Sequence, residues 1–229
     1  MKKLLIAFLI IISTSCKKDE IDLTYPGTAR LAVVVSGITW APVNAGYTTE
    51  RPNGLLYQWG RMYGQEYIST DTIPGPVALS VGNNSSNSSN FFTVQATPFN
   101  WCTTSFTLWD MTSYNPCPEG WRVPTTTELA VLNAAGSTWL YSPTDNPDGL
   151  PGRWFGGNHG TDHVGSVFLP ATGFRNVSKG AATIRGTMGD YWSSEASGIY
   201  SSSLFFTSSG ANMASDYRAG GLPVRCVRK

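Results

Sequence analysis

Short runs of β-branched and aromatic residues, separated by turn-forming residues, set the pattern of this chain. Residues 31–35 and 38–43 are two such runs, and Ser36 and Gly37 between them predict a hairpin or a bent strand. Residues 55–63 suit either a short helix or a buried strand, and periodicity does not choose between the two. Four later runs between Gly-rich turns also predict strands: residues 166–170, 190–194, 203–207 and 222–227.

One helix is predicted with well-defined ends. The residue before Pro124 is driven toward extended backbone, so the chain reaches this point as an extended segment. Thr125 then serves as a helix N-cap, and Glu128 three positions later completes a capping box. The apolar stripe of the helix and the glycine that ends it lie at Leu129, Leu132 and Gly136.

The rest of the pattern gives the domain organisation. Residues 17–30 carry charge, a proline and a glycine but no periodicity, which predicts a tether before a single domain over residues 31–229. Residues 80–90 are polar and low in complexity, and they predict a loop tip. Residues 142–162 are rich in Gly and Pro and predict a long irregular loop. Strands, one main helix, a long loop and further strands together indicate an α+β fold with an antiparallel sheet.

Residues 1–16 have the layout of a bacterial lipoprotein signal. Lys2 and Lys3 precede an apolar run over residues 4–12, small residues follow, and charge begins directly after Cys16. The run is shorter than the ~20 residues that cross a bilayer, so we expect a lipidated Cys16 rather than a membrane-spanning helix. An ordinary secretory signal with an incidental cysteine is the alternative. The acidic residues that follow resemble the surface-export signal of Bacteroidetes lipoproteins, which favours the outer face of the outer membrane over the periplasm.

Composition narrows the possible partners. Sixteen Lys and Arg against fifteen Asp and Glu give a net charge of +1, so the chain as a whole carries no electrostatic footprint for nucleic acid. Charged residues make up 14%, below the usual quarter or so, and polarity comes instead from Ser, Thr, Asn and Gly. Such surfaces are common in exported proteins that meet neutral partners such as glycans. They are also common in exported β-rich proteins generally.

Several ordered blocks resemble one protein family. Residues 115–129 (NPCPEGWRVPTTTEL) resemble the Fibrobacter succinogenes major paralogous domain, over a match that extends through residues 31–229. The other matching blocks are residues 37–44 (GITWAPVN), 54–59 (GLLYQW), 168–175 (FLPATGFR), 189–194 (GDYWSS) and 224–228 (VRCVR). The resemblance implies a C-type-lectin-like fold, in which the termini meet in one sheet and a long loop region projects from the other side. Members are mostly cell-surface or secreted proteins without an assigned activity.

The cysteines support an exported fold. With Cys16 assigned to lipid, three cysteines remain, and three cannot all pair internally. The lectin-like architecture joins a cysteine just before the first helix to one in the last strand, which the resemblance places at Cys117 and Cys226. Cys102 is then a buried free thiol, and a competing bridge from Cys102 to Cys117 is the alternative.

Two groups of residues are candidate metal ligands. His159 and His163 lie four apart, but the glycines around them argue against a helix that would bring both to one metal, so we interpret them as structural or solvated. Asp145, Asn146 and Asp148 offer oxygen ligands in the long loop, where C-type lectins hold calcium. The match to the lectin motif is partial, and an Asx-Pro turn is the simpler interpretation. No other cofactor is predicted.

The aromatic residues divide by position. Those in strand-like blocks are expected to pack in the core: Trp40, Trp59, Trp121 and Trp192. Those in or beside the long loop are the candidate ligand-binding residues, because their rings can stack on sugar faces: Trp139, Tyr141, Trp154 and Phe155. Packing of the loop on the body of the domain is the alternative role for this second set.

These observations favour a non-catalytic surface lipoprotein that binds a glycan or a protein partner through residues 142–162. One alternative is an enzyme on a scaffold related to the formylglycine-generating enzymes, whose activity depends on cysteines in a substrate cleft. A structural component of a surface assembly or pilus tip is another. Hydrolase chemistry has little support, because the serine-rich residues 193–209 contain no Gly-x-Ser-x-Gly elbow.

Overall fold

Antiparallel sheet makes up most of the structure. The computed structural model describes residues 22–68, 70–109, 113–141, 149–157 and 165–229. Within these ranges, α2 (Thr126–Ala134) is the one helix of more than two turns. Four of the five sheets are antiparallel, which agrees with the predicted antiparallel sheet and single main helix.

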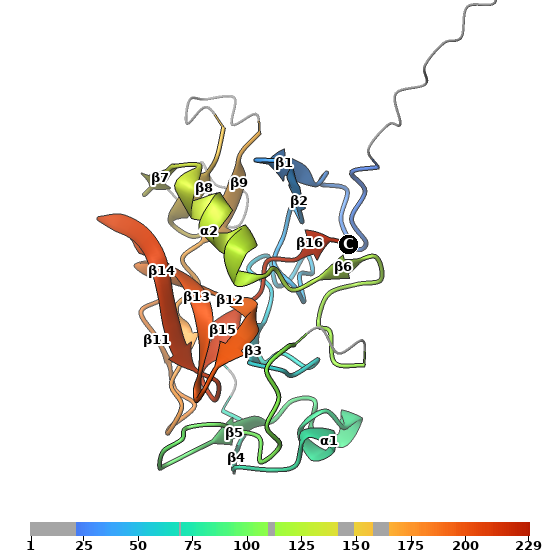
Figure 1. Cartoon of the computed structure of the whole chain (residues 1–229), viewed down its shortest axis with the longest axis vertical. Coiled ribbons are helices and arrows are strands. Elements are labelled where there is room, and N and C mark those ends of the chain that lie inside the picture. The colour runs from blue at the N-terminus through green and yellow to red at the C-terminus, as the bar shows by residue number, and fades with distance from the viewer. Residues whose placement is uncertain (1–21, 69, 110–112, 142–148, 158–164) are drawn as a thin grey trace, which may run out of the picture.

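The first sheet joins the beginning and the end of the described chain (Figure 1). Its strands, in spatial order, are β1 (Val33–Val35), β2 (Ile38–Trp40), β16 (Val227–Arg228) and β6 (Trp121–Arg122). Ser36 and Gly37 have φ values of 49° and 80°, the left-handed conformation that a two-residue hairpin turn requires, so the predicted hairpin is confirmed. Trp40 pairs with Val227, which places the last strand beside one of the first two.

A three-stranded meander and a neighbouring sheet enclose the main core. The meander consists of β12 (Met188–Ser197), β13 (Tyr200–Thr207) and β14 (Gly210–Tyr217). The neighbouring sheet consists of β7 (Ser137–Leu140), β8 (Gly152–Phe155) and β9 (Val167–Pro170). Leu129 and Leu132 of α2 pack between them with Tyr191, Leu204 and Phe206, and all five are fully buried.

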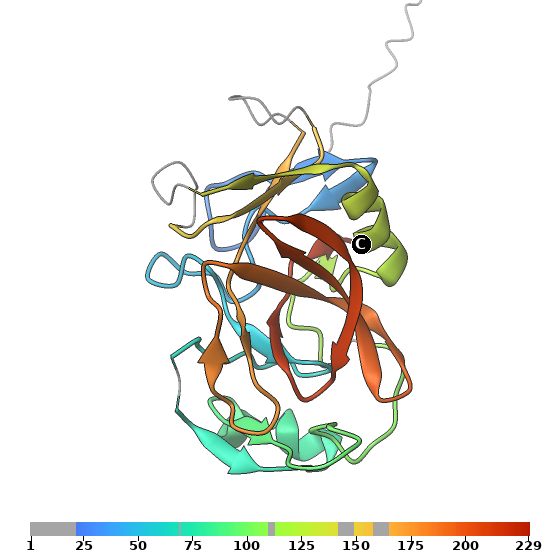
Figure 2. The ribbon, with the colours of Figure 1, turned by 90° about the vertical axis from the view of Figure 1, so that its left-hand side faces the viewer.

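Two smaller sheets complete the fold. One has the order β11 (Ala182–Thr183), β10 (Phe174–Arg175), β15 (Gly221–Pro223) and β3 (Leu56–Gln58). The other is a parallel pair, β4 (Thr72–Pro74) and β5 (Phe91–Thr93). Residues 55–63 therefore contribute a strand rather than a helix. Figure 2 shows the β4–β5 pair at the opposite end of the molecule from β7–β9.

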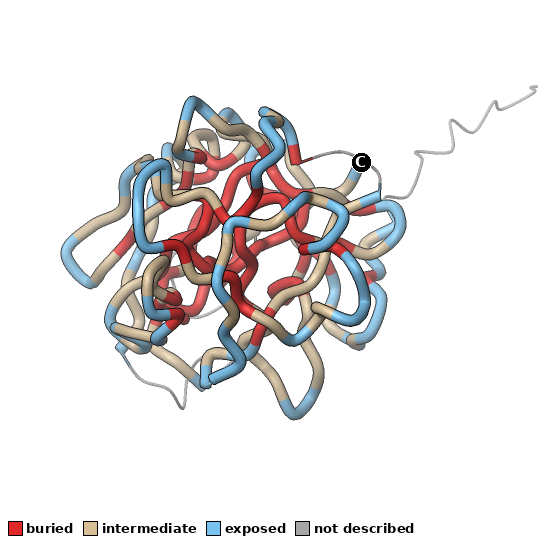
Figure 3. The backbone as a smooth tube through the Cα atoms, turned by 90° about the horizontal axis from the view of Figure 1, so that it is seen from below, coloured by how far each residue is buried: buried red, intermediate tan, exposed pale blue. Residues whose placement is uncertain are grey.

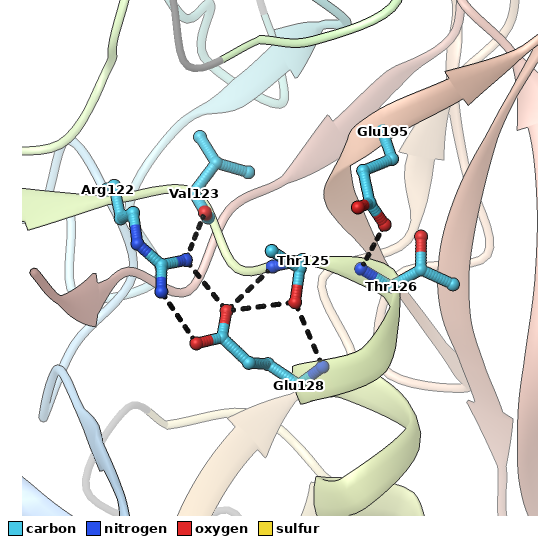
Figure 4. Close-up of polar contacts among 6 residues, drawn as sticks. All are labelled: Arg122, Val123, Thr125, Thr126, Glu128 and Glu195. Carbon is cyan, nitrogen blue, oxygen red and sulfur yellow. Dashed lines mark hydrogen bonds and ion pairs between the residues drawn. The ribbon is translucent and has the colours of Figure 1, made fainter.

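The start of α2 is fixed by polar contacts that the sequence predicted (Figure 4). Thr125 Oγ1 accepts a hydrogen bond from the backbone N–H of Glu128, and the Glu128 carboxylate accepts one from the backbone N–H of Thr125. Arg122 binds both carboxylate oxygens of Glu128 at 2.7 Å. Burial acts to raise the pKa of Glu128, but these hydrogen bonds hold it below its ordinary value. The capping box is confirmed, and Arg122 ties it to β6.

Residues 80–90 are not the loop tip that their composition suggested. They contain most of α1 (Leu79–Gly82) and all of the 3₁₀ turn η1 (Ser85–Asn87). The fully buried guanidinium of Arg61 organises this segment by donating to the carbonyls of Gly82, Asn87 and Asn90 at 2.6–3.0 Å. A low-complexity polar segment is therefore folded by a cation that lies outside it in sequence.

Three other predicted boundaries are corrected. The predicted tether packs from its middle, because Tyr25 is 6% exposed and its ring lies 4.9 Å from that of Trp121. The predicted last strand divides into β15 and β16, which belong to different sheets. The predicted irregular loop over residues 142–162 contains β8.

The buried stretches of backbone gather in the middle of the molecule (Figure 3), and the side chains buried there include large aromatic residues and several arginines. The four tryptophans assigned to the core are each at most 3% exposed, which confirms their packing role: Trp40, Trp59, Trp121 and Trp192. Arg61, Arg175 and Arg225 are fully buried beside them. Burial lowers the pKa of Arg61 to about 9 and that of Arg175 to about 10, so each remains charged at neutral pH.

Cys117 and Cys226 form a disulfide, with their Cα atoms 6.0 Å apart. The bond joins the segment before β6 to the segment before β16, so it links two parts of the first sheet. Cys102 is a buried free thiol, so the alternative bridge from Cys102 to Cys117 is wrong. The predicted disulfide is confirmed.

Asp190 is a buried carboxyl group on β12. It is 4% exposed, and Ser203 on β13 and Asp216 on β14 continue the same diagonal across the sheet. Burial raises the pKa of Asp190 well above its ordinary value, and the charge and hydrogen bond of Asp216 raise it further. The environment of Asp190 therefore favours its protonated form.

Asp190→Asn is expected to remove a pH dependence of stability. In the wild type, the unfolded chain loses the Asp190 proton as pH rises above about 4, whereas the folded chain keeps it until its raised pKa is reached. Stability conferred by the protonated group is therefore present at low pH and falls as pH rises through this interval, by up to about 1.4 kcal/mol per pH unit.

Urea unfolding of both proteins at roughly pH 4, 5, 6 and 7, upward from the ordinary aspartate pKa of about 4, measures the effect. The stability difference in favour of the variant should grow with pH. Asp22→Asn is the control, because Asp22 is exposed and hydrogen bonds from Arg228 and Thr24 lower its pKa, so its contribution to stability is lost only below about pH 4 and the difference between this variant and the wild type should stay nearly constant over the range measured. If the free energies of unfolding of wild type and Asp190→Asn change with pH in parallel, Asp190 does not hold a proton in the folded state.

Candidate functional site

The four aromatic residues proposed as ligand contacts do not share one surface. The register of β7–β9 pairs Ser137 with Phe155, and Thr138 with Trp154. Because side chains alternate along a strand, Trp139 and Phe155 lie on one face of this sheet and Trp154 lies on the other. These residues are close in sequence, which suggested a cluster. The pleat of the sheet instead places Trp154 on a different face from Trp139 and Phe155.

The shared face of Trp139 and Phe155 is turned toward the protein. Phe155 is fully buried against Phe206, at 5.5 Å between ring centroids, so it has no surface to offer a ligand. Trp139 is half-buried and also packs against Phe206, at 6.4 Å. Packing on the body of the domain is thus the observed role of Phe155 and the main role of Trp139.

Tyr141 and Trp154 retain accessible surface. Tyr141 is 72% exposed, just beyond the end of β7, with its ring 5.9 Å from that of Trp139. Trp154 is half-buried on the opposite face of the sheet, 5.2 Å from Phe168. Tyr141 is therefore the most accessible ring of the predicted set, and its one described ring neighbour, Trp139, meets it edge to face rather than as a flat platform.

The proposed metal ligands lie outside the described residues. This applies to Asp145, Asn146 and Asp148 and to the two histidines, His159 and His163. Within the ranges that the structure does describe, no group of three or more His, Cys, Asp or Glu side chains could hold a metal ion. The calcium hypothesis therefore stays a prediction.

A pocket with a volume of about 730 Å³ lies at the opposite end of the molecule from β7–β9, between the β4–β5 pair and one end of the β12–β14 meander. We call it the Arg218 pocket. Its wall is mostly apolar, and the residues that define its shape are Pro76, Val94, Pro98, Cys102, Ile199 and Arg218. Such a volume and a mostly apolar exposed area are usual features of a small-molecule or peptide-anchor site, and threonine, serine, asparagine and glutamine side chains also line it.

Three parts of the chain build this pocket. Two of its walls are the segments at the ends of β4 and β5, which are rich in proline, glycine and threonine. Ile199 comes from the β12–β13 turn, and Arg218 directly follows β14. The backbone N–H of Val77 donates to the carbonyl of Trp101, and that of Thr103 to the carbonyl of Val77, which holds the two walls together.

Arg218 is the one charged side chain of the pocket, and it is 6% exposed. Its guanidinium lies over the ring of Trp59, at 5.3 Å from the centroid, and donates to the carbonyls of Phe106 and Gly198. Its Nε–H has no hydrogen-bond acceptor. Burial lowers the pKa of Arg218, an effect that the neighbouring Cys102 partly opposes. An arginine remains charged under such a shift, so the pocket contains a buried cation.

The Cys102 thiol lines the same pocket at 3% exposure. Burial raises its pKa, and the backbone N–H of Thr104, which donates to the sulfur at 3.3 Å, and the charge of Arg218 offset this only in part. The thiol is therefore protonated at neutral pH and is a weak nucleophile.

A second, smaller pocket of about 220 Å³ is lined by charges of both signs. Arg51 Nε lies 3.8 Å from Glu66 Oε1, and the Arg185 guanidinium lies 4.9 Å from the centroid of the Tyr67 ring. Ile68, at 80% exposure, also lines it. The Arg218 pocket differs because its described lining includes a cation but no carboxylate.

Sequence reasoning missed the Arg218 pocket. Its walls come from residues 74–105, 199 and 218, which no local pattern connects. The one available signal was the odd cysteine, Cys102, because an exported chain seldom leaves a thiol unpaired without a reason.

Comparison with known proteins finds no matching family model, no matching curated protein and no matching solved structure. Among the helices in the described ranges, none is long and apolar enough to span a bilayer. Any assignment of function therefore rests on the geometry and chemistry of this chain.

Proposed function

We propose that this chain is a lipid-anchored, non-catalytic recognition protein of the outer membrane that binds its ligand in the Arg218 pocket. The observation that carries the proposal is the pocket itself, an apolar cavity of about 730 Å³ around a buried cation with an unused donor. The domain that presents it is proposed to be a C-type-lectin-like member of the Fibrobacter succinogenes major paralogous family. Pairing of the last strand, β16, with β2 in the sheet that also contains β1, and the Cys117–Cys226 bond, support that assignment.

Binding is favoured over catalysis by the state of the cysteines. A formylglycine-generating mechanism requires reactive cysteines in a cleft, but Cys117 and Cys226 are bonded to each other. Cys102 does line a cleft, but its raised pKa keeps it as a thiol. A thiol titration of the native protein checks this: Cys102 should react slowly and Cys226 should not react. A reactive Cys226 would favour the enzyme instead.

Cys16→Ser is expected to release the protein from the membrane fraction. Acyl chains on Cys16 would supply the membrane affinity, at roughly 0.8 kcal/mol for each buried methylene, and serine cannot form the thioether that carries them. Fractionation and mass analysis of the N-terminal peptide measure the effect. Cys102→Ser is the matched control and should leave the protein in the membrane fraction. If wild-type protein carries no acyl chain on residue 16, the anchor is wrong.

Ligand arrays test recognition directly. The full chain, purified in lipid nanodiscs, is applied to a glycan array and to a peptide array. Ala96→Trp places a large ring in the wall of the Arg218 pocket, and Tyr141→Ala removes the exposed ring beside β7. We expect Ala96→Trp to weaken binding by about tenfold or more and Tyr141→Ala to leave it unchanged. The reverse result would move the site to the β7–β9 surface and support glycan stacking there.

A further inference from the structure

Among the residues that the structure describes, the buried charge of Arg218 has no acidic partner. Its polar contacts are two backbone carbonyls, those of Phe106 and Gly198, and its other contact is the face of the Trp59 ring. Carbonyls and a ring solvate a guanidinium, but they do not neutralise it. Burying a cation without an anion is unfavourable, so the site gains from any anion that reaches it.

The Arg218 guanidinium also has an N–H group that makes no hydrogen bond. Arginine carries five N–H groups in a planar fork, and Nε–H of Arg218 has no acceptor. An edge of this fork that includes Nε matches the two oxygens of a carboxylate. The donor is buried, like the unpartnered Nη2 of Arg175, so it points to a ligand only together with the pocket that Arg218 lines.

The lining limits the charge and the shape of the ligand. Arg218 is the one cation in the wall, so a single negative charge is balanced there, whereas the second charge of a phosphate monoester would remain unpaired. Beyond Arg218 most of the exposed wall is apolar and comes from Val94, Ile199 and proline rings, with threonine, serine and amide side chains between them. The anion should therefore be attached to a body with an alkyl or aromatic face.

From this juxtaposition we infer that the Arg218 pocket binds a monocarboxylate on an apolar body, with the carboxylate paired to Arg218 and the body against Val94 and Ile199. The inference rests on the proposed function and specifies its ligand. Two sources share this chemistry, namely a free organic acid and the C-terminal residue of a protein partner.

Matched acid and amide probes test the inference by equilibrium dialysis. One pair is naphthylacetate and naphthylacetamide, and the other is the acetylated peptide Gly-Gly-Ala-Val-Leu with a free or an amidated C-terminus. The full chain in nanodiscs is compared with empty nanodiscs, which corrects for partition into lipid. We expect each acid that binds to bind about tenfold or more tightly than its amide, because only the acid pairs with the cation. The pair with the larger preference identifies the source.

Two variants and a labelling experiment locate the effect. Arg218→Gln should abolish the preference for acid over amide, whereas Arg185→Gln, an exposed arginine that lines only the smaller pocket, should preserve it. Bound acid should also slow alkylation of Cys102 in the same wall. If Arg218→Gln does not fold, the wild-type acid and amide comparison and the Cys102 protection still decide the question.

Failure of the inference differs from failure of the proposed function. Equal binding of acid and amide, or a neutral array ligand that protects Cys102, overturns the carboxylate assignment and leaves the pocket as a binding site. If no probe and no array ligand binds at the pocket, both are wrong.

Discussion

Replacing both Cys117 and Cys226 by alanine should lower the free energy of unfolding by about 4 to 5 kcal/mol. The bond closes a loop with a sequence separation of 109, and in the chain-entropy model a loop of this length restricts the unfolded chain by that amount. Both side chains are buried, so alanine adds no unsatisfied polar group. For a domain whose total stability is usually only ~5–15 kcal/mol, this is a large fraction.

Urea unfolding without reductant measures this loss. Cys102→Ala is the matched control, because it removes a buried sulfur without opening a loop, and it should reduce stability by much less. Reduction of the wild type should reproduce the effect of the double variant. If oxidised and reduced wild type unfold at the same urea concentration, the bond does not contribute as described.

Arg225→Met should destabilise the fold by about 3 to 5 kcal/mol. The fully buried Arg225 guanidinium donates to Asn44 Oδ1, to the Ala41 carbonyl and to the Phe168 carbonyl, all at 2.9–3.0 Å. These bonds join the segment after β2 to β9. Methionine fills part of the same volume, but it leaves three buried acceptors without a donor, which is the costly part of the change.

The matched control for this variant is Arg185→Met. Arg185 is exposed, so its replacement should change stability by no more than about 0.5 kcal/mol. Thermal and urea unfolding of the two variants give the comparison. A loss below about 1 kcal/mol for Arg225→Met would mean that water or a rearranged backbone satisfies these acceptors.

Local signals predicted the elements that depend on local physics. The hairpin around Ser36 and Gly37 needs two residues with positive φ, and the start of α2 needs Thr125 and Glu128. Both appear directly in the sequence. The Cys117–Cys226 pair came from the family resemblance, and the structure confirms it.

The features that could not be predicted depend on contacts between residues that are far apart in the sequence. Nothing near Arg61 or Arg225 shows that each binds carbonyls from distant segments, so the buried arginines and the folded residues 80–90 were missed. The strand β14 alternates small and polar residues and lacks an apolar run, so it gave no strand signal.

The candidate site illustrates the same division. Trp139, Tyr141, Trp154 and Phe155 are close in sequence, but the pairing of β7 with β8 decides which face each side chain takes. The Arg218 pocket depends on the approach of residues 74–105 to Ile199 and Arg218. A single sequence contains no direct record of that approach.

Under the proposed function, the pairing of β2 with β16 has a mechanical consequence. Asp22 also contacts Arg228 at 2.9 Å, so both extremities of the described chain leave from one corner of the body. If a lipid tether precedes residue 22 and flow drags a captured partner, tension that enters at residue 22 meets this strand pair and the neighbouring disulfide first. The strand pair and the disulfide would then bear the load before the cavity at the opposite end of the molecule does.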